Sequence, residues 1–209
     1  MEKVSHLWHK KQQQDKQKMN WDGHKEELKK GESVSFRGMK IYTKTGDKGT
    51  TLSYGLRVPK HDCSVDGQGE IDELNAWIGM IRDKIMDVPV LEKIQRDLME
   101  IGAQLATGNT RITEEDIEKL ESCIDLMESD LPELKNFIIP KSTPEIHVAR
   151  TVCRRAERVV SAWEAERKDS TPDSIRRFNL VIPYLNRLSD YLFVLARTFD
   201  KEEKIWKTK

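Results

Sequence analysis

The 209-residue chain has no excess of one charge, because 36 Lys and Arg residues balance 36 Asp and Glu residues. It therefore sets up no global field that would attract nucleic acid or an anionic membrane. No apolar run approaches the roughly 20 residues that span a bilayer, and the start, Met1 to His6, contains no apolar signal-peptide core. We expect a cytoplasmic protein with no membrane and no nucleic-acid partner.

Metal-binding and nucleophilic patterns are also missing. The three cysteines, Cys63, Cys123 and Cys153, are far apart in the chain, and the five histidines show no metal-ligand spacing. An odd, sparse cysteine count fits a reducing compartment. No Ser/His/Asp or Cys/His arrangement is legible. The sequence thus predicts no metal-ligating residues, and chemistry that depends on positioning and charge neutralisation.

From about Gly69 onward, apolar residues recur at helical spacing. Thr113 is placed to cap a third helix, Pro144 to open a fourth, and Pro183 lies early in a fifth. The pattern predicts an all-α fold, a five-helix bundle with ferritin-like up-down packing. The expected inward stripes are Ile71, Leu74, Ile78, Ile81 and Ile85; Ile94, Leu98, Ile101 and Leu105; Ile117, Leu120, Ile124, Met127 and Leu131; Val148, Val152, Val159 and Trp163; and Leu185, Leu188, Leu192, Leu195 and Phe199.

The chain divides into three expected regions. Residues 1–38 are rich in Lys and Gln and poor in apolar positions, which predicts a mobile N-terminal extension. Residues 39–200 form the helical-bundle domain, which an extended, glycine-hinged loop over 40–62 precedes. Residues 201–209 are expected to form a C-terminal tail.

The segment from Thr43 to Thr51 carries hydroxyls, lysines and two glycines. Glycines let backbone amides approach an anion closely, and the other side chains add donors and charge. The spacing is not that of a Walker loop, and on its own a polar turn is an equally good interpretation. The positions that we assign to an anion site are Thr43, Lys44, Thr45, Gly46, Asp47, Gly49, Thr50 and Thr51.

A second segment places Arg150, Arg154 and Arg158 four residues apart. This spacing puts them on one helix face over about 12 Å, with Arg155 to the side and Glu157 able to hold one guanidinium. Like charges at this spacing repel one another, and an anionic ligand would offset that repulsion. A polyphosphate suits bidentate guanidinium forks. We therefore favour a polyphosphate-binding face over the alternative, a charged face that is only solvated.

Two further segments are ambiguous by pattern alone. Asn186, Ser189, Asp190 and Phe193 share the side of the fifth helix opposite its leucines, which fits either a lined pocket or a hydrogen-bond network between helices. The acidic run at Asp72 is sufficiently explained, by pattern alone, as a complement to a helix N-terminus.

Together these segments resemble the trimeric ATP:cob(I)alamin adenosyltransferase family of PduO type, from Met39 to about Phe199. The resemblance is carried by several motifs in order: Ile41 to Thr51, Arg57 to Lys60, Asp72 to Asn75, Phe137 to Pro140, Arg150 to Arg158, and Leu185 to Asp190. Two departures stand out. Lys141, Ser142 and Thr143 follow Pro140 where the family usually has a Gly-Gly pair, and Tyr54-Gly55-Leu56 replaces a Phe-Gly-Gly-type turn.

The resemblance implies that the cobalt of cob(I)alamin attacks C5′ of ATP and expels triphosphate, giving adenosylcobalamin. The loop and Lys60 would cradle the triphosphate with Mg²⁺, and K⁺ is a further implied cation. Arg150, Arg154, Arg155 and Arg158 would neutralise the leaving group, and Glu157 and Asn186 would fix ATP. In a homotrimer with ATP at subunit interfaces, Asp72 would pair with Arg150 of a neighbour. Phe137 would displace the lower cobalt ligand.

Two other hypotheses stay open at this point. A non-catalytic bundle could sense ATP or deliver a cofactor to a partner, with residues 1–38 as a docking arm; the altered segment after Pro140 favours it. A nucleic-acid-binding helix at Arg150 to Arg158 is disfavoured by the zero net charge. If the chain is an enzyme, its product would be handed to an adenosylcobalamin-dependent enzyme.

Overall fold

A computed structural model describes residues 40, 42–53, 55–85, 88–109, 111–166, 179–200 and 204–206. The chain falls into two compact units, Met1–Asp47 and Lys48–Lys209, which are described separately below. The predicted extension over residues 1–38 lies outside the described residues.

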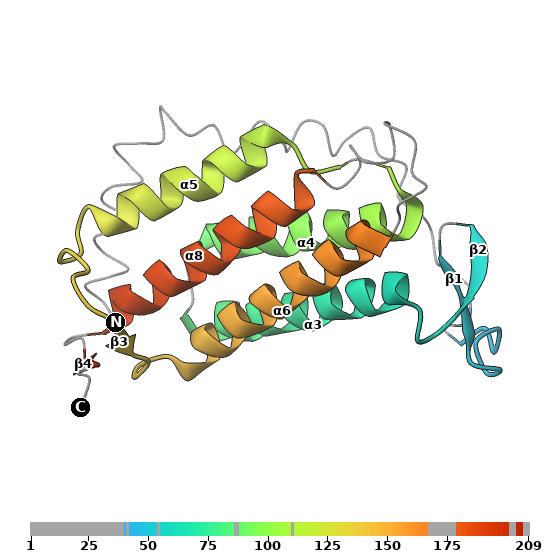
Figure 1. The fold of residues 1–209 in the computed structure, drawn as a ribbon. Coiled ribbons are helices and arrows are strands. Elements are labelled where there is room, and N and C mark those ends of the chain that lie inside the picture. Colours follow the sequence, from blue (N-terminus) through green and yellow to red (C-terminus); the bar gives the residue numbers. More distant parts are fainter. Residues whose placement is uncertain are drawn as a thin grey trace. The chain divides into compact units, whose positions relative to one another are not determined.

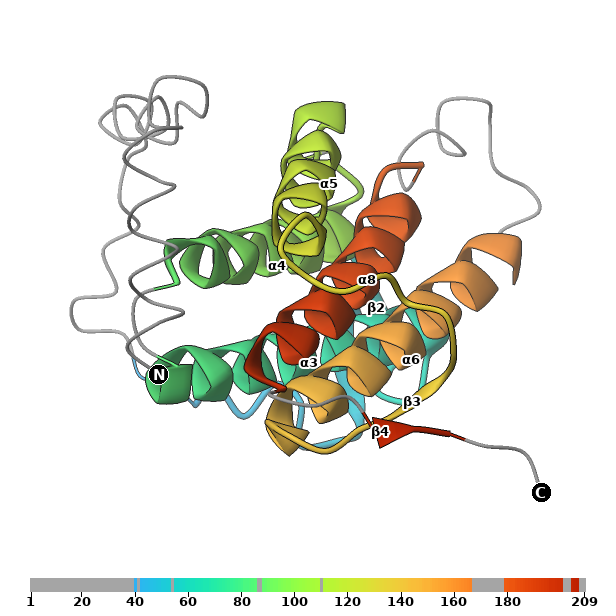
Figure 2. The same cartoon turned by 90° about the vertical axis from the view of Figure 1, so that its left-hand side faces the viewer.

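In the described part of the second unit, five helices form the bundle that the sequence predicts (Figure 1): α3 (Cys63–Ile85), α4 (Pro89–Thr107), α5 (Glu114–Glu128), α6 (Pro144–Glu166) and α8 (Val181–Phe199). Helix α3 packs against α4 and α6, α6 against α8, and α8 against α5; Figure 2 shows α8 and α6 side by side over α3. No helix in these described stretches is both long and apolar enough to cross a membrane.

The core follows most of the predicted stripes. The α4 stripe of Ile94, Leu98, Ile101 and Leu105 has no exposed surface at all. The prediction that Val148 faces the core was wrong, because this residue is 37% exposed. Helix α6 turns small side chains inward instead, which lets its backbone approach α3 and α8; its buried residues include Ile146, Ala149, Val152, Cys153, Ala156, Val160 and Trp163.

The helix ends follow local chemistry. Thr113 is the N-cap of α5, as predicted, and the Asp116 carboxylate accepts a hydrogen bond from its backbone N–H at 3.0 Å, as in a capping box. The Thr113 hydroxyl donates to the same oxygen at 2.8 Å. Pro144 is the first residue of α6 and Pro183 the third of α8, where a missing N–H removes no helical hydrogen bond. Helix α3 begins at Cys63, earlier than the apolar pattern suggests.

The loop predicted over 40–62 contains an antiparallel hairpin, formed by β1 (Thr50–Ser53) and β2 (Leu56–Pro59). Gly55 sits at its turn with φ 71°, a conformation that glycine adopts without steric cost. Ser64 Oγ donates to Ser53 Oγ at 3.0 Å in the interior, which ties the hairpin to the start of α3. The prediction of an extended, glycine-hinged loop agrees with these strands but did not include their pairing.

A second, two-residue pairing joins distant parts of the chain. Strand β3 (Ile138–Ile139) pairs antiparallel with β4 (Lys204–Ile205). Nearby, the Ser142 backbone N–H donates to Asp200 Oδ1 at 3.1 Å. The segment beyond α8 is thereby joined to the segment that leads into α6.

Candidate functional site

Three arginines follow one another along α6. Helix α6 runs unbroken through Arg150, Arg154 and Arg158, so they project from one face at successive turns. Arg158 Nη1 donates to the Arg154 carbonyl oxygen at 2.9 Å. Burial, and then the charge of Arg154, lower the pKa of Arg150. Within the described stretches none of the three forms an ion pair.

Arg155 is held differently from its neighbours. Its Nε donates to Glu70 Oε2 at 2.6 Å, and its Nη2 pairs with Glu73. Hydrogen bonding to Glu70 is the main reason that the pKa of Arg155 is raised. The guanidinium thus joins α6 to α3, and both carboxylates compensate its charge.

Glu157 and Asn186, which the sequence assigns to one site from two distant segments, lie together. Asn186 Nδ2 donates to Glu157 Oε1 at 3.1 Å, and Arg187 Nη1 donates to Asn186 Oδ1 at 2.9 Å. Arg187 also pairs with Glu121 of α5 at 2.6 Å. Glu157 therefore accepts from an amide of α8, rather than holding a guanidinium of its own helix, and a chain of contacts fixes the amide.

The Thr/Gly/Lys loop spans the boundary between the two units. In the first unit, the hydroxyl oxygens of Thr43 and Thr45 are 2.8 Å apart, and the Asp47 N–H faces the Lys44 carbonyl at 3.4 Å. Lys44 has φ 58°, so the backbone curls tightly here.

The rest of the loop belongs to the second unit. Gly49 has φ 76°, and its carbonyl accepts from the Lys60 N–H at 2.9 Å. The structure thereby brings Lys60 beside the end of the loop, with its side chain exposed.

Asp72 lies on an exposed position in the interior of α3, well past the helix start at Cys63. The interpretation of this acidic run as a complement to a helix N-terminus was therefore wrong. Glu73, the next residue, is engaged with Arg155.

A cavity of about 1090 Å³ opens at the β3–β4 end of the second unit. Phe137 is its most exposed aromatic residue, with 81% of its surface accessible. Arg150, the first arginine of the α6 face, also lines it, so one residue belongs both to the cavity and to the cationic face. The lining residues are Leu134, Lys135, Asn136, Phe137, Ile138, Pro140, His147, Arg150, Phe193, Ile205 and Trp206.

Trp206 is a cavity residue that the sequence interpretation missed, because residues 201–209 were taken as a tail. Its ring meets Phe137 edge-on, with centroids 6.4 Å apart and planes at 78°. Its backbone N–H donates to the Phe137 carbonyl at 2.8 Å. The apolar pair Ile205-Trp206 in an otherwise charged terminus was the available signal. Phe193, which the sequence placed on the polar side of α8, lines the same cavity.

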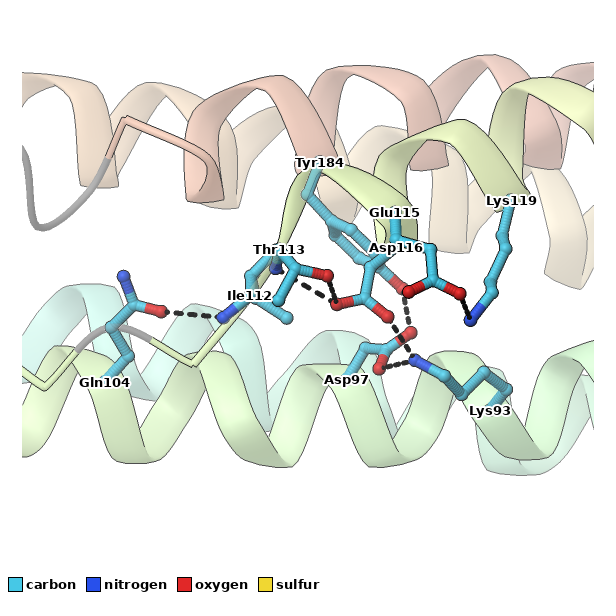
Figure 3. A network of polar contacts seen from close by, with 9 residues as sticks. All are labelled: Lys93, Asp97, Gln104, Ile112, Thr113, Glu115, Asp116, Lys119 and Tyr184. Atoms are coloured by element: carbon cyan, nitrogen blue, oxygen red, sulfur yellow. Dashed lines mark hydrogen bonds and ion pairs between the residues drawn. The ribbon is translucent and has the colours of Figure 1, made fainter. Parts of the chain in front are cut away.

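A second polar cluster, which contains none of these arginines, joins α4, α5 and α8 (Figure 3). Lys93 pairs with Asp97 and, at 2.8 Å, with Asp116. The fully buried Tyr184 hydroxyl donates to Asp97 Oδ2 at 2.9 Å. Burial raises the pKa of Asp97. Burial acts the same way on Asp116, but hydrogen bonds from Lys93 and Thr113 outweigh it and lower that pKa.

Comparisons with known proteins are consistent across sequence and fold. The family model described as Cobalamin adenosyltransferase matches residues 41–199. A corrinoid adenosyltransferase of Bacillus subtilis is 40% identical over 182 residues, covering 80% of this chain and 90% of that protein. One from Mus musculus is 39% identical over 192 residues, covering 80% and 77%.

Comparison with solved structures gives the same family as the sequence comparisons. A single-residue variant of a PduO-type ATP:corrinoid adenosyltransferase from Lactobacillus reuteri, complexed with cobalamin and ATP, superposes with a TM-score of 0.69 at 32% identity. The match covers 81% of this chain and all of that one. Another variant of it, complexed with ATP, gives a TM-score of 0.67 at 33% identity over 80% of this chain and all of the other.

Proposed function

The chain belongs to the cobalamin adenosyltransferase family, and we propose that it transfers the 5′-deoxyadenosyl group of ATP to cob(I)alamin. The products are adenosylcobalamin and triphosphate. The observation that carries the proposal is Arg150, which links the cationic face of α6 to a large aromatic-lined cavity. ATP held along the arginines would therefore lie close to a corrinoid in that cavity.

The proposed reaction needs no protein nucleophile, because the cobalt of the substrate is the nucleophile. The cobalt of the substrate attacks C5′, the bond from C5′ to the phosphate oxygen breaks, and triphosphate leaves with that electron pair. Arg154 and Arg158, which share one face of α6, would neutralise the growing charge. Their charge stabilises the transition state more than bound ATP.

Other residues are proposed to position the nucleotide. Glu157 and Asn186, already joined at 3.1 Å, would hold the adenosine end. The loop from Thr43 to Thr51 and Lys60 would cradle the triphosphate with Mg²⁺, and K⁺ is a further proposed cation. Arg155 would support the ATP site structurally, because its ion pairs with Glu70 and Glu73 join α6 to α3.

The assembly and the corrinoid side complete the proposal. In a homotrimer with ATP between subunits, Asp72 of one subunit would pair with Arg150 of the next. Phe137, which presents 81% of its surface, would press against the corrinoid and displace the lower axial ligand of cobalt. We place the enzyme in the cytoplasm, from which the product passes to an adenosylcobalamin-dependent enzyme.

The test is an anaerobic assay with ATP, cobalamin and a strong reductant, in which the absorption spectrum reports adenosylcobalamin. We expect turnover by the wild type and a loss of about 10²- to 10³-fold in kcat for Arg154→Ala. Arg96→Ala is the matched control, because Arg96 is an exposed arginine of α4 paired with Glu92. Absence of product from folded, ATP-binding wild type would refute the function; normal turnover by Arg154→Ala would refute the role of that arginine.

A non-catalytic ATP-binding bundle is the alternative, and the segment after Pro140 favours it. Thr143 there has φ 48°, a strained backbone conformation for a β-branched residue. Deleting residues 1–38 separates the two functions, since an enzyme keeps its turnover whereas a docking protein loses its partner.

A further inference from the structure

His147 is a buried polar residue that the proposed reaction does not use. It lies in the first turn of α6, is only 8% exposed, and lines the Phe137 cavity. Neither of its ring nitrogens has a hydrogen-bond partner among the described residues. One turn further along, the Nε of Arg150 is also buried and unpartnered within that part of the chain. Two adjoining orphan polar groups beside one cavity are rare in native structures and call for an explanation.

The surroundings keep the imidazole neutral. Burial, and then the charge of Arg150, lower the pKa of His147, and Asp200 opposes them. Lys135, a further charged residue of the cavity wall, pairs with Glu133 at 3.2 Å. A neutral imidazole offers one N–H donor and one acceptor nitrogen. The matching ligand group is uncharged and carries both a donor and an acceptor.

We propose that His147 binds the corrinoid substrate by donating a hydrogen bond to the oxygen of a carboxamide on the edge of the corrinoid ring system. The Nε–H of Arg150 is a second donor to the same oxygen. The inference rests on the proposed function. A carboxamide has a carbonyl oxygen and N–H groups on one planar unit, which complements a neutral imidazole beside a guanidinium. The apolar wall formed by Phe137, Phe193 and Trp206 suits the ring system itself.

The ring nitrogens of His147 can reach a ligand in the cavity only if the His147 side chain moves. Both nitrogens are covered by protein, although the residue faces the cavity. A turn of the ring about its Cβ–Cγ bond, whose torsion is broad in histidine, would direct a nitrogen toward the ligand. Satisfying two orphan groups on binding would favour the turned position.

The experiment compares three substitutions. His147→Leu keeps an apolar volume and removes both hydrogen-bonding nitrogens, whereas His147→Gln and His147→Asn keep a donor and an acceptor. Val148→Ala is the control on the same helix, because Val148 lies on the exposed side. The readouts are KM for cobalamin, KM for ATP, and the Kd of cob(II)alamin titrated spectroscopically into the ATP-loaded protein.

For His147→Leu we expect the cobalamin KM and the cob(II)alamin Kd to rise about tenfold, with the ATP KM unchanged. At least one amide variant should recover most of this loss. A role in packing alone would instead affect both substrates equally, or the amide variants as much as His147→Leu, and either result would overturn the proposal. If His147→Leu does not fold, the two amide variants carry the test. Corrinoid Kd values for His147→Gln and His147→Asn that equal those of the wild type and of Val148→Ala support the proposal. Weaker corrinoid binding by both amide variants contradicts the proposal.

The failures of the two proposals are distinguishable. Wild type that transfers the adenosyl group, with His147→Leu binding cob(II)alamin normally, would overturn only the role of His147. Wild type that binds cob(II)alamin in a His147-dependent manner without turnover would overturn only the catalytic function. A wild-type protein that neither binds nor reacts would overturn both.

Discussion

Replacing Lys93 with methionine tests whether the buried cluster of Figure 3 is held by one cation between two carboxylates. Lys93 contacts Asp97 and Asp116, whose residues are 6% and 8% exposed. Methionine keeps the volume of the side chain but leaves both carboxylates without their cation. Removing one partner from a buried ion pair costs about 3 to 5 kcal/mol. We expect a loss of that size, toward the upper end because two acids are affected.

The measurement is urea unfolding followed by circular dichroism at one fixed protein concentration, so that any assembly contributes equally. Lys135→Met is the control, because Lys135 and its partner Glu133 pair at 3.2 Å with side chains that are 71% and 79% exposed. Exposed pairs contribute roughly 0 to 1 kcal/mol. A loss for Lys93→Met no larger than that of the control would refute the reasoning.

The pH dependence provides a second check. The folded pKa of Asp97 is raised by burial, so its charge destabilises the fold at neutral pH and this cost is relieved as pH falls through that pKa. Without Lys93, the pKa of Asp97 rises further. The difference in stability between Lys93→Met and wild type should therefore narrow from pH 7 toward pH 5. A constant or widening difference would show that Asp97 does not titrate in this way.

Two other predictions concern single sites. Thr143→Gly should stabilise the fold by about 1 to 2 kcal/mol in thermal or urea unfolding, because it relieves a φ of 48° and removes a buried hydroxyl that has no partner in the described residues; a loss of stability would contradict this. Thiol labelling of the native protein at pH 8 should modify Cys63 first, because Cys153 is buried and burial raises the pKa of Cys123 to about 11. Modification of Cys123 or Cys153 before Cys63 in folded protein would count against the packing.

The helices were predictable because burial imposes a period of 3.6 on the sequence. The stripe beginning at Ile94 is wholly buried. Helix α6 shows where the signal weakens, since a core surface of small residues such as Ala149 and Ala156 does not stand out from a helix exterior. Val148 is the larger apolar residue, and it lies outside.

The site was predictable only in part. The spacing of Arg150, Arg154 and Arg158 sets their common face, because that depends on helical geometry alone. The contact between Asn186 and Glu157 needed two helices to be packed together. The position of Trp206 beside Phe137 needed the pairing of β3 with β4, which no local pattern encodes. Long-range contacts of this kind depend on the assembled fold.

That pairing affects how the protein should be made and handled. Because Ile205 and Trp206 line the cavity, its wall is complete only when the segment after α8 has paired with β3. An affinity tag fused after Lys209 would be separated from Trp206, a residue of the cavity wall, by three residues. A tag joined at Met1 lies outside the family match at 41–199. A chain that ended before β4 would lack Ile205 and Trp206 from the cavity wall while keeping the sequences of the five described helices.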